Sequence, residues 1–165
     1  MEKIFSWSSC SGWLCLACPV QDAVQINFFT HKGSRSENVV VQRKSDVSTI
    51  AWHPTEVIVC VAWSDGLLNI LSPESSEYAA TENVGSKVLF LSWSADGKSL
   101  CAAKEDGKCY LYASNGKNSL IKSAECQIND RPTAMCDRVS VLLNRGNPRG
   151  PLRVRQSRNK YRQDS

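Results

Sequence analysis

Short apolar stretches recur along most of the chain, separated by polar turns that contain Gly, Pro, Asp or Asn. Val57–Trp63 is apolar throughout, which is typical of a strand buried on both faces. The segment Val47–Trp52 precedes it across a His-Pro-Thr-Glu turn, and Asp65-Gly66 separates it from the apolar segment Leu67–Leu71. Because Asp-Gly suits the type I′ turn, we expect a tight hairpin there. The pattern predicts an all-β chain of short antiparallel strands.

This arrangement recurs at intervals of 45 and 41 residues, set by three tryptophans. An apolar residue lies two positions before each Trp, a Cys lies eight positions after it, and Asp-Gly begins thirteen positions after the second and third. The shared positions are Trp7, Cys15, Trp52, Cys60, Asp65, Gly66, Trp93, Cys101, Asp106 and Gly107. We interpret all of them as structural: the tryptophans as core, the cysteines as small residues packed between units, and Asp-Gly as turns.

A unit of about 40 residues with four strands has the length of a blade of a WD-repeat β-propeller. The expected blades span about residues 4–42, 47–81 and 88–123. Weaker outer strands are expected at Val39–Gln42, Glu77–Thr81 and Leu120–Ser123. Closure takes about four to eight blades, so residues 1–130 are predicted to form an incomplete WD-repeat β-propeller of about three four-stranded blades.

The repeats are degenerate. Ser45-Asp46 and Ser86-Lys87 stand where most WD repeats have Gly-His, and Leu71-Ser72 and Tyr112-Ala113 stand where most have Trp-Asp. The usual Asp-His hydrogen-bond network is therefore not expected. Loops that could reach partners are His31–Asn38 and Ser72–Glu77, with no reason to prefer either.

The positive charge belongs to the last stretch of the chain. Residues 1–130 hold 11 Lys and Arg against 14 Asp and Glu, whereas residues 131–165 hold 9 against 2. This Arg-, Gly- and Pro-rich tail is predicted to be disordered, after one short strand at Arg138–Leu143. An acidic body gives no electrostatic support to nucleic-acid binding by the chain as a whole.

Eight cysteines raise the question of metal or disulfides. Only Cys15 and Cys18 form a C-x-x-C pair, no second pair follows at zinc-ligand spacing, and His31 and His53 match no ligand pattern. We therefore expect reduced cysteines in a cytosolic protein, without metal or cofactor. No apolar run is long enough for a transmembrane helix, and the serine-rich N-terminus with Glu2 does not favour a signal peptide.

The segment Ile50–Ile70, with its Trp-His-Pro-Thr turn at residues 52–55, Trp63 and Asp65-Gly66, resembles the N-terminal propeller of the intraflagellar transport protein 140 family. The next repeat, VLFLSWSADGKSLCAAKEDGKCYLY, resembles the following blade, and the resemblance covers roughly residues 4–128. It implies a subunit of intraflagellar transport complex A, with other complex A subunits and ciliary cargo as partners. The second propeller and helical repeats of that family are not in this sequence, and the pattern ends near Arg131.

The resemblance implies a non-catalytic scaffold that acts in retrograde intraciliary transport, cilium assembly and ciliary membrane-protein trafficking. The expected location is the cytoplasm and the cilium, at the axoneme and the ciliary base. Two alternatives stay open: a vesicle-coat-type propeller, and nucleic-acid or anionic-lipid binding through the Arg-rich tail. An enzyme is not expected, because the shared positions show no Ser-His-Asp set, phosphate loop or acid pair.

Overall fold

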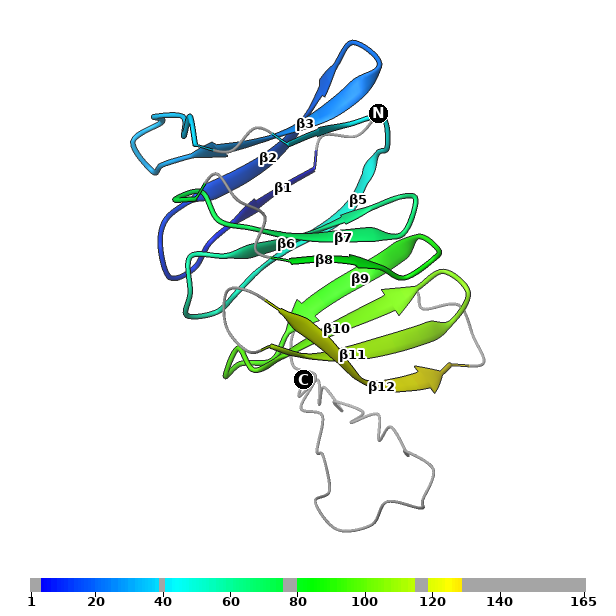
Figure 1. The fold of residues 1–165 in the computed structure, drawn as a ribbon. Coiled ribbons are helices and arrows are strands. Elements are labelled where there is room, and N and C mark those ends of the chain that lie inside the picture. Colours follow the sequence, from blue (N-terminus) through cyan, green and yellow to red (C-terminus); the bar gives the residue numbers. More distant parts are fainter. Residues whose placement is uncertain (1–3, 39–40, 76–79, 115–118, 129–165) are drawn as a thin grey trace, which may run out of the picture.

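The computed structural model describes residues 4–38, 41–75, 80–114 and 119–128, and these ranges form three four-stranded antiparallel sheets (Figure 1). Each sheet is a meander in which neighbours along the chain pair. The first blade contains β1 (Ile4–Trp7), β2 (Leu14–Val20), β3 (Ala23–Phe29) and β4 (Val41–Arg43). The second contains β5 (Val47–Trp52), β6 (Val59–Trp63), β7 (Leu67–Leu71) and β8 (Ala80–Asn83). The third contains β9 (Val88–Trp93), β10 (Ser99–Lys104), β11 (Lys108–Ser114) and β12 (Leu120–Gln127).

The predicted fold class, an incomplete propeller of three four-stranded blades, is confirmed. Strands β5 and β7 have the predicted bounds, whereas β6 begins two residues later than predicted. The reason is a wider turn, in which the backbone N–H of His53 donates to the carbonyl of Ile58 at 2.9 Å. The predicted strand at Arg138–Leu143 and the basic tail lie outside the described residues.

The predicted type I′ geometry of the Asp-Gly hairpins is wrong. That turn needs positive φ at both central residues. Only the glycines have it here: Gly66 has φ +87° and Gly107 has φ +81°, and neither Asp65 nor Asp106 is in that region. Each hairpin is instead a three-residue loop that ends in a left-handed glycine, closed in the first case by the Gly66 N–H on the carbonyl of Trp63 at 3.0 Å.

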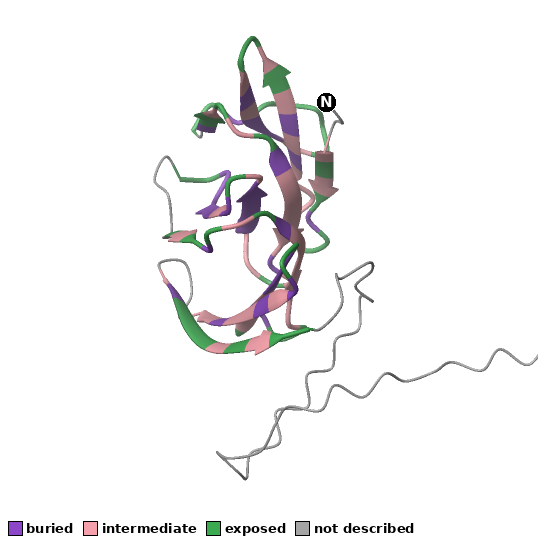
Figure 2. Cartoon of the chain, turned by 90° about the vertical axis from the view of Figure 1, so that its right-hand side faces the viewer, coloured by how far each residue is buried: buried purple, intermediate pink, exposed green. Residues whose placement is uncertain are grey.

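The blades stack side by side along their first strands, so that β1 lies next to β5 and β5 next to β9 (Figure 1). An apolar cluster fills each of the two spaces between blades. The cluster between blades 1 and 2 contains Phe28, Ile26, Val61 and Trp63, and the cluster between blades 2 and 3 contains Ile58, Leu68, Val88 and Leu100. Exposed residues gather on β12 and on the loops (Figure 2). Burial of each aliphatic side chain stabilises the folded state by about 1.5–3 kcal/mol. Because these side chains lie in the two interblade clusters, the interfaces between blades form the core of this fold.

Candidate interaction surface

One contact repeats at both interfaces between blades. The indole N–H of Trp52 donates to the carbonyl of Ser6 at 2.9 Å, and that of Trp93 donates to the carbonyl of Ala51 at 3.2 Å. In each case the acceptor is the residue that precedes the repeat Trp of the preceding blade. The tryptophans therefore fix the step from one blade to the next, as well as contributing apolar contact area.

The first repeat Trp differs from the other two. Trp52 and Trp93 are half-buried against the interblade clusters, whereas 53% of Trp7 and 63% of Phe5 are exposed. The prediction that the tryptophans are core is thus wrong for Trp7. The reason is positional: Phe5 and Trp7 alternate along β1 with Ile4, which packs on the cluster between blades 1 and 2, so they lie on the other side of the strand.

His53 locks the second interface. Its ring is buried, and its Nδ1 accepts the backbone N–H groups of Thr55 and Glu56 at 3.3 and 2.9 Å. Because Nδ1 is an acceptor, Nε2 carries the proton and donates to the carbonyl of Gly97 at 2.9 Å, across the interface. The ring also packs edge to face on Trp93, with 4.8 Å between the two ring centroids. One side chain therefore closes its own turn and holds the turn of the next blade.

The ends of the first strands form a shallow hollow of about 420 Å³ that spans all three blades. We call this side of the molecule the tryptophan end. Equivalent positions of the three repeats line the hollow: Ser6, Trp7 and Ser9; Ile50, Ala51, Trp52 and Pro54; Leu91, Ser92, Trp93, Ser94 and Ala95. An aromatic surface with exposed backbone and hydroxyl groups is suited to binding another polypeptide.

Two loops at the tryptophan end, which the sequence left as equal candidates, contact each other. The hydroxyl of Ser36 donates to the carbonyl of Pro73 at 2.8 Å, and both residues are buried. The isolated bridge between Phe29 and Arg35 holds the base of the first loop. Residues 31–38 and the described part of the second loop, residues 72–75, therefore form one continuous surface between blades 1 and 2.

The Asp-Gly hairpins lie at the opposite end of the sheets, where their Asp side chains form ion pairs. Asp65 accepts the Leu67 N–H at 3.2 Å and pairs with Arg43 of blade 1 at 2.8 Å. The Arg43 guanidinium also stacks on the Trp63 ring at 5.1 Å. A second hollow, of about 390 Å³, lies here between blades 1 and 2. Asp65 is thus an interblade contact as well as a turn residue.

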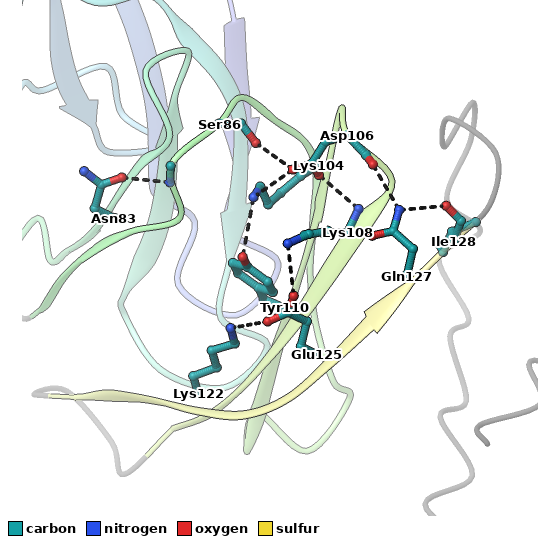
Figure 3. A network of polar contacts seen from close by, with 11 residues as sticks. Asn83, Ser86, Lys104, Asp106, Lys108, Tyr110, Lys122, Glu125, Gln127 and Ile128 are labelled. Carbon is teal, nitrogen blue, oxygen red and sulfur yellow. Dashed lines mark hydrogen bonds and ion pairs between the residues drawn. The ribbon is translucent and has the colours of Figure 1, made fainter. Parts of the chain in front are cut away.

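Asp106 has the corresponding place in blade 3, within a denser network (Figure 3). It accepts the Lys108 N–H at 3.0 Å and pairs with the Lys104 ammonium at 3.1 Å. The Lys108 N–H is the main cause of a lowered pKa for this carboxyl, and Lys104 adds to it. Only 5% of the Lys104 side chain is exposed, so the charge depends on Asp106 and on the Tyr110 ring at 4.8 Å.

Two of the three shared cysteines are buried between blades and the third is not, just as two of the three repeat tryptophans lie between blades and the third does not. Cys15 and Cys60 are fully buried at the first and second interface, where burial raises the pKa of each thiol above its usual range. Cys101 is partly exposed on the side of blade 3 that faces away from blade 2. Cys109 and Cys126 lie on that side too, and burial raises the pKa of Cys109 to about 12. Such thiols are poor nucleophiles.

Sequence reasoning missed the interblade roles of His53, Arg43 and the indole N–H groups. The Trp-His-Pro-Thr turn marked His53 as part of a motif, but its acceptor at Gly97 lies 44 residues away. It also missed a buried contact in blade 2, where the Trp63 indole donates to Asn69 at 2.7 Å and Asn69 donates to Thr81 at 3.1 Å. Within the described ranges, no group of three His, Cys, Asp or Glu residues is arranged to hold a metal ion.

Comparison with known proteins identifies the family to which this three-bladed chain belongs. The sequence model described as the IFT140 first beta-propeller matches residues 1–140. The chain belongs to the IFT140 first β-propeller family. Its blades therefore correspond to part of a propeller whose family was already indicated by the Trp-His-Pro-Thr turn and the repeat spacing.

More distant relatives share the WD-repeat fold. WD repeat-containing protein 35 from Rattus norvegicus is 24% identical over 110 residues, which is 66% of this chain and 9% of that protein. The proteins of that name from Mus musculus and Homo sapiens match to the same extent. The chain thus spans about a tenth of the length of these relatives.

Solved structures with low sequence identity show the fold alone. A chain in the crystal structure of the mitotic checkpoint complex superimposes with a TM-score of 0.62 at 18% identity, covering 78% of this chain and 37% of that one. A chain in the complex of KlAtg21 with the coiled coil of AgAtg16 gives a TM-score of 0.63 at 14% identity, covering 78% and 44%. No helix in the described residues has the length and apolar character needed to cross a membrane.

Proposed function

We propose that this chain is a protein-interaction segment of intraflagellar transport complex A. Its proposed roles are retrograde intraciliary transport, cilium assembly and ciliary membrane-protein trafficking. The observation that carries the proposal is the match of residues 1–140 to the first propeller of IFT140. The proposed partners are other complex A subunits and ciliary cargo, and the proposed location is the cytoplasm, the axoneme and the ciliary base.

The side chains support a binding role better than catalysis. Propellers of WD-repeat families are generally non-catalytic scaffolds. Asp65 and Asp106 each accept a backbone N–H within their own turn. Both ring nitrogens of His53 form hydrogen bonds with backbone groups. The tryptophan end instead offers a hollow lined by the rings of the repeat tryptophans. The same end carries the two loops that contact each other through Ser36 and Pro73, and we propose this end as the contact surface.

The family match favours a ciliary transport scaffold over a vesicle-coat propeller. Binding of nucleic acid or anionic lipid through the Arg-rich tail rests on residues outside those described. No observation on the described blades favours either alternative.

The proposal is tested by expressing the tagged full-length chain in ciliated cells. We expect it at the ciliary base and axoneme, and we expect complex A subunits to co-purify with it. Ala95→Arg places a charge in the hollow at the tryptophan end and should reduce co-purification at least several-fold. Gln42→Arg adds the same side chain to the exposed edge of β4 and is the matched control.

Uniform cytoplasmic staining without any complex A subunit would contradict the scaffold proposal. Equal loss of co-purification with Gln42→Arg and Ala95→Arg would instead contradict the assignment of the tryptophan end as the contact surface. Circular dichroism of both variants verifies that each one is folded.

A further inference from the structure

In every blade, the residue that follows the repeat Trp closes the turn after the first strand. In blade 1 the Ser8 hydroxyl accepts a backbone N–H of its own turn at 3.2 Å. In blade 3 the Ser94 hydroxyl accepts the Ser99 N–H at 2.9 Å. In blade 2 the residue is His53, whose Nδ1 accepts the Glu56 N–H at 2.9 Å. The three turns are thus closed in the same way, but only blade 2 uses a side chain whose charge can change near neutral pH.

The contacts of the His53 ring require its neutral form. Nδ1 accepts the backbone N–H groups of Thr55 and Glu56, so the single ring hydrogen is on Nε2, which donates to the Gly97 carbonyl. A second proton on Nδ1 would face two N–H donors at 3.3 and 2.9 Å, and both hydrogen bonds would be lost. Only 3% of His53 is exposed, so the ring cannot present this proton to solvent without leaving its site.

The charged groups around the ring form no ion pair with it. The titratable or charged side chains on the three turns packed around His53 are Cys10 in blade 1, Glu56 in blade 2, and Asp96 and Lys98 in blade 3. The Asp96 carboxylate accepts the Ser94 hydroxyl at 2.6 Å and the Lys98 N–H at 3.1 Å, and these contacts, the hydroxyl first, lower the pKa of Asp96. Within the described ranges, no salt bridge joins His53 to a carboxylate. A proton on Nδ1 would therefore have no acceptor in the closed arrangement.

The turn that His53 closes lies between the turns of the other two blades. On one side the Cys10 thiol of blade 1 contacts the carbonyls of His53 and Glu56 at 3.9 and 3.7 Å, and on the other side the ring holds Gly97 of blade 3. We propose that His53 is a proton-sensitive latch of the tryptophan end. The neutral ring joins the turns of blades 2 and 3, and protonation of the ring releases them. Because Pro54 and Ala95 of these two turns line the hollow, release changes the shape of the hollow.

The direction of the pH effect follows from where the proton binds. A proton from solvent adds to Nδ1 of the released ring, so the open state binds one proton more than the latched state, and the latch weakens as the pH falls. Histidine in an unfolded peptide is half-protonated near about pH 6.5. The equilibrium between latched and open states should therefore shift toward the open state by about tenfold between pH 7.5 and pH 5.5. The latch is a property of the chain itself and does not rest on the proposed partners.

The test uses nuclear magnetic resonance of the full-length chain, which contains two histidines, so that each ring can be followed separately. At pH 7.5 we expect the hydrogen of the His53 ring on Nε2 and none on Nδ1. Amide hydrogen exchange then reports opening of the latch: the protection of the Glu56 amide, corrected for its intrinsic exchange rate, should fall about tenfold from pH 7.5 to pH 5.5. The Ser99 amide, which the Ser94 hydroxyl holds in the corresponding turn of blade 3, should keep its protection.

Two variants isolate the His53 ring as the source of the effect. His53→Asn keeps a side-chain acceptor for the turn but does not titrate, so the protection of its Glu56 amide should not change between pH 7.5 and pH 5.5. His31→Ala, at an exposed position, should behave like the wild type.

Four results would overturn the proposal. Three of them come from the wild-type chain alone and decide the question even if His53→Asn does not fold: hydrogen on Nδ1 of His53 at pH 7.5, Glu56 protection that does not change with pH, or an equal loss of protection at Glu56 and Ser99, which would indicate general unfolding by acid. The fourth is a His53→Asn variant that folds and still loses Glu56 protection as the pH falls.

Discussion

At the scale of single residues, the structure depends on side chains that form hydrogen bonds with backbone groups far away in the sequence. His53 accepts two N–H groups of its own turn and donates to the Gly97 carbonyl of the next blade. Gly97 has φ +70°, and a Cβ there would overlap the His53 ring. The two residues therefore form one unit, in which the absence of a side chain at Gly97 is what admits the ring.

We predict that His53→Ala and Gly97→Ala each lower the free energy of unfolding by about 2–3 kcal/mol, measured by urea denaturation. His53→Ala leaves buried backbone groups unpaired at a cost of about 1–3 kcal/mol, and Gly97→Ala displaces the ring. Because both changes break the same unit, the double variant should lose less than the sum. Full additivity would contradict the coupling. His31→Ala, at an exposed position, is the control.

The sequence predicted what depends on local chemistry and missed what depends on the step between blades. The spacing of Trp52 and Trp93 gave the repeat, and Asp65-Gly66 gave the place of a hairpin, though not its turn type. No local pattern could show that an indole N–H reaches a carbonyl more than 40 residues away, or that Trp7 lies on an outward side. Those facts follow from how one twisted sheet stacks on the next.

At the scale of elements, the hairpins are fixed by glycines that serve two purposes. Gly66 has φ +87°, and a Cβ there would lie 2.6 Å from the backbone nitrogen of Ser86. The carbonyl of Gly66 also accepts the Val84 N–H at 2.9 Å. The β6–β7 hairpin therefore fits closely against the chain that leads from β8 into blade 3.

We predict that Gly66→Ala is clearly more destabilising than Gly33→Ala, measured by thermal and urea denaturation. Gly33 has a similar φ of +82° but no atom within 4 Å of its Cβ position, so it reports backbone strain alone, about 1–2 kcal/mol. Gly66→Ala adds a clash with backbone, for at least about 1 kcal/mol more. Equal losses would show that the approach of Ser86 does not constrain the hairpin.

The β10–β11 hairpin should give a pH-dependent contribution to stability. Its Asp106 has a lowered pKa in the folded state, caused first by the Lys108 N–H and then by Lys104. A carboxyl whose pKa is lowered by folding stabilises the folded state at pH values above its ordinary pKa of 3.8. That stabilisation is lost as the pH falls through the lowered pKa of the folded state. Asp106→Asn keeps an acceptor for Lys108 but removes the charge beside Lys104.

We therefore predict that the wild type melts at a higher temperature than Asp106→Asn near neutral pH, and that the difference shrinks as pH drops to about 3. Because Asp106 is exposed, the difference should be modest and should fall with added salt. A difference that stays constant from neutral to acidic pH would show that the Asp106 charge is not its source. Asp22→Asn, at another exposed turn, serves as the control.

At the scale of the whole molecule, each described blade packs on its neighbour along the chain, through β1 with β5 and through β5 with β9, as in other repeat architectures. The two interior interfaces each combine an apolar cluster with a Trp-to-carbonyl hydrogen bond. The stability of the stack therefore depends on the contacts that each interior interface makes.

We accordingly predict that Trp93→Ala lowers the melting temperature of the chain more than Trp7→Ala does, measured by thermal denaturation. Trp93 is half-buried against the cluster between blades 2 and 3, and its indole N–H donates to the Ala51 carbonyl at 3.2 Å. Trp7 is 53% exposed, so its truncation removes less interior packing. Equal losses would mean that the step between blades 2 and 3 does not depend on the contact that Trp93 makes.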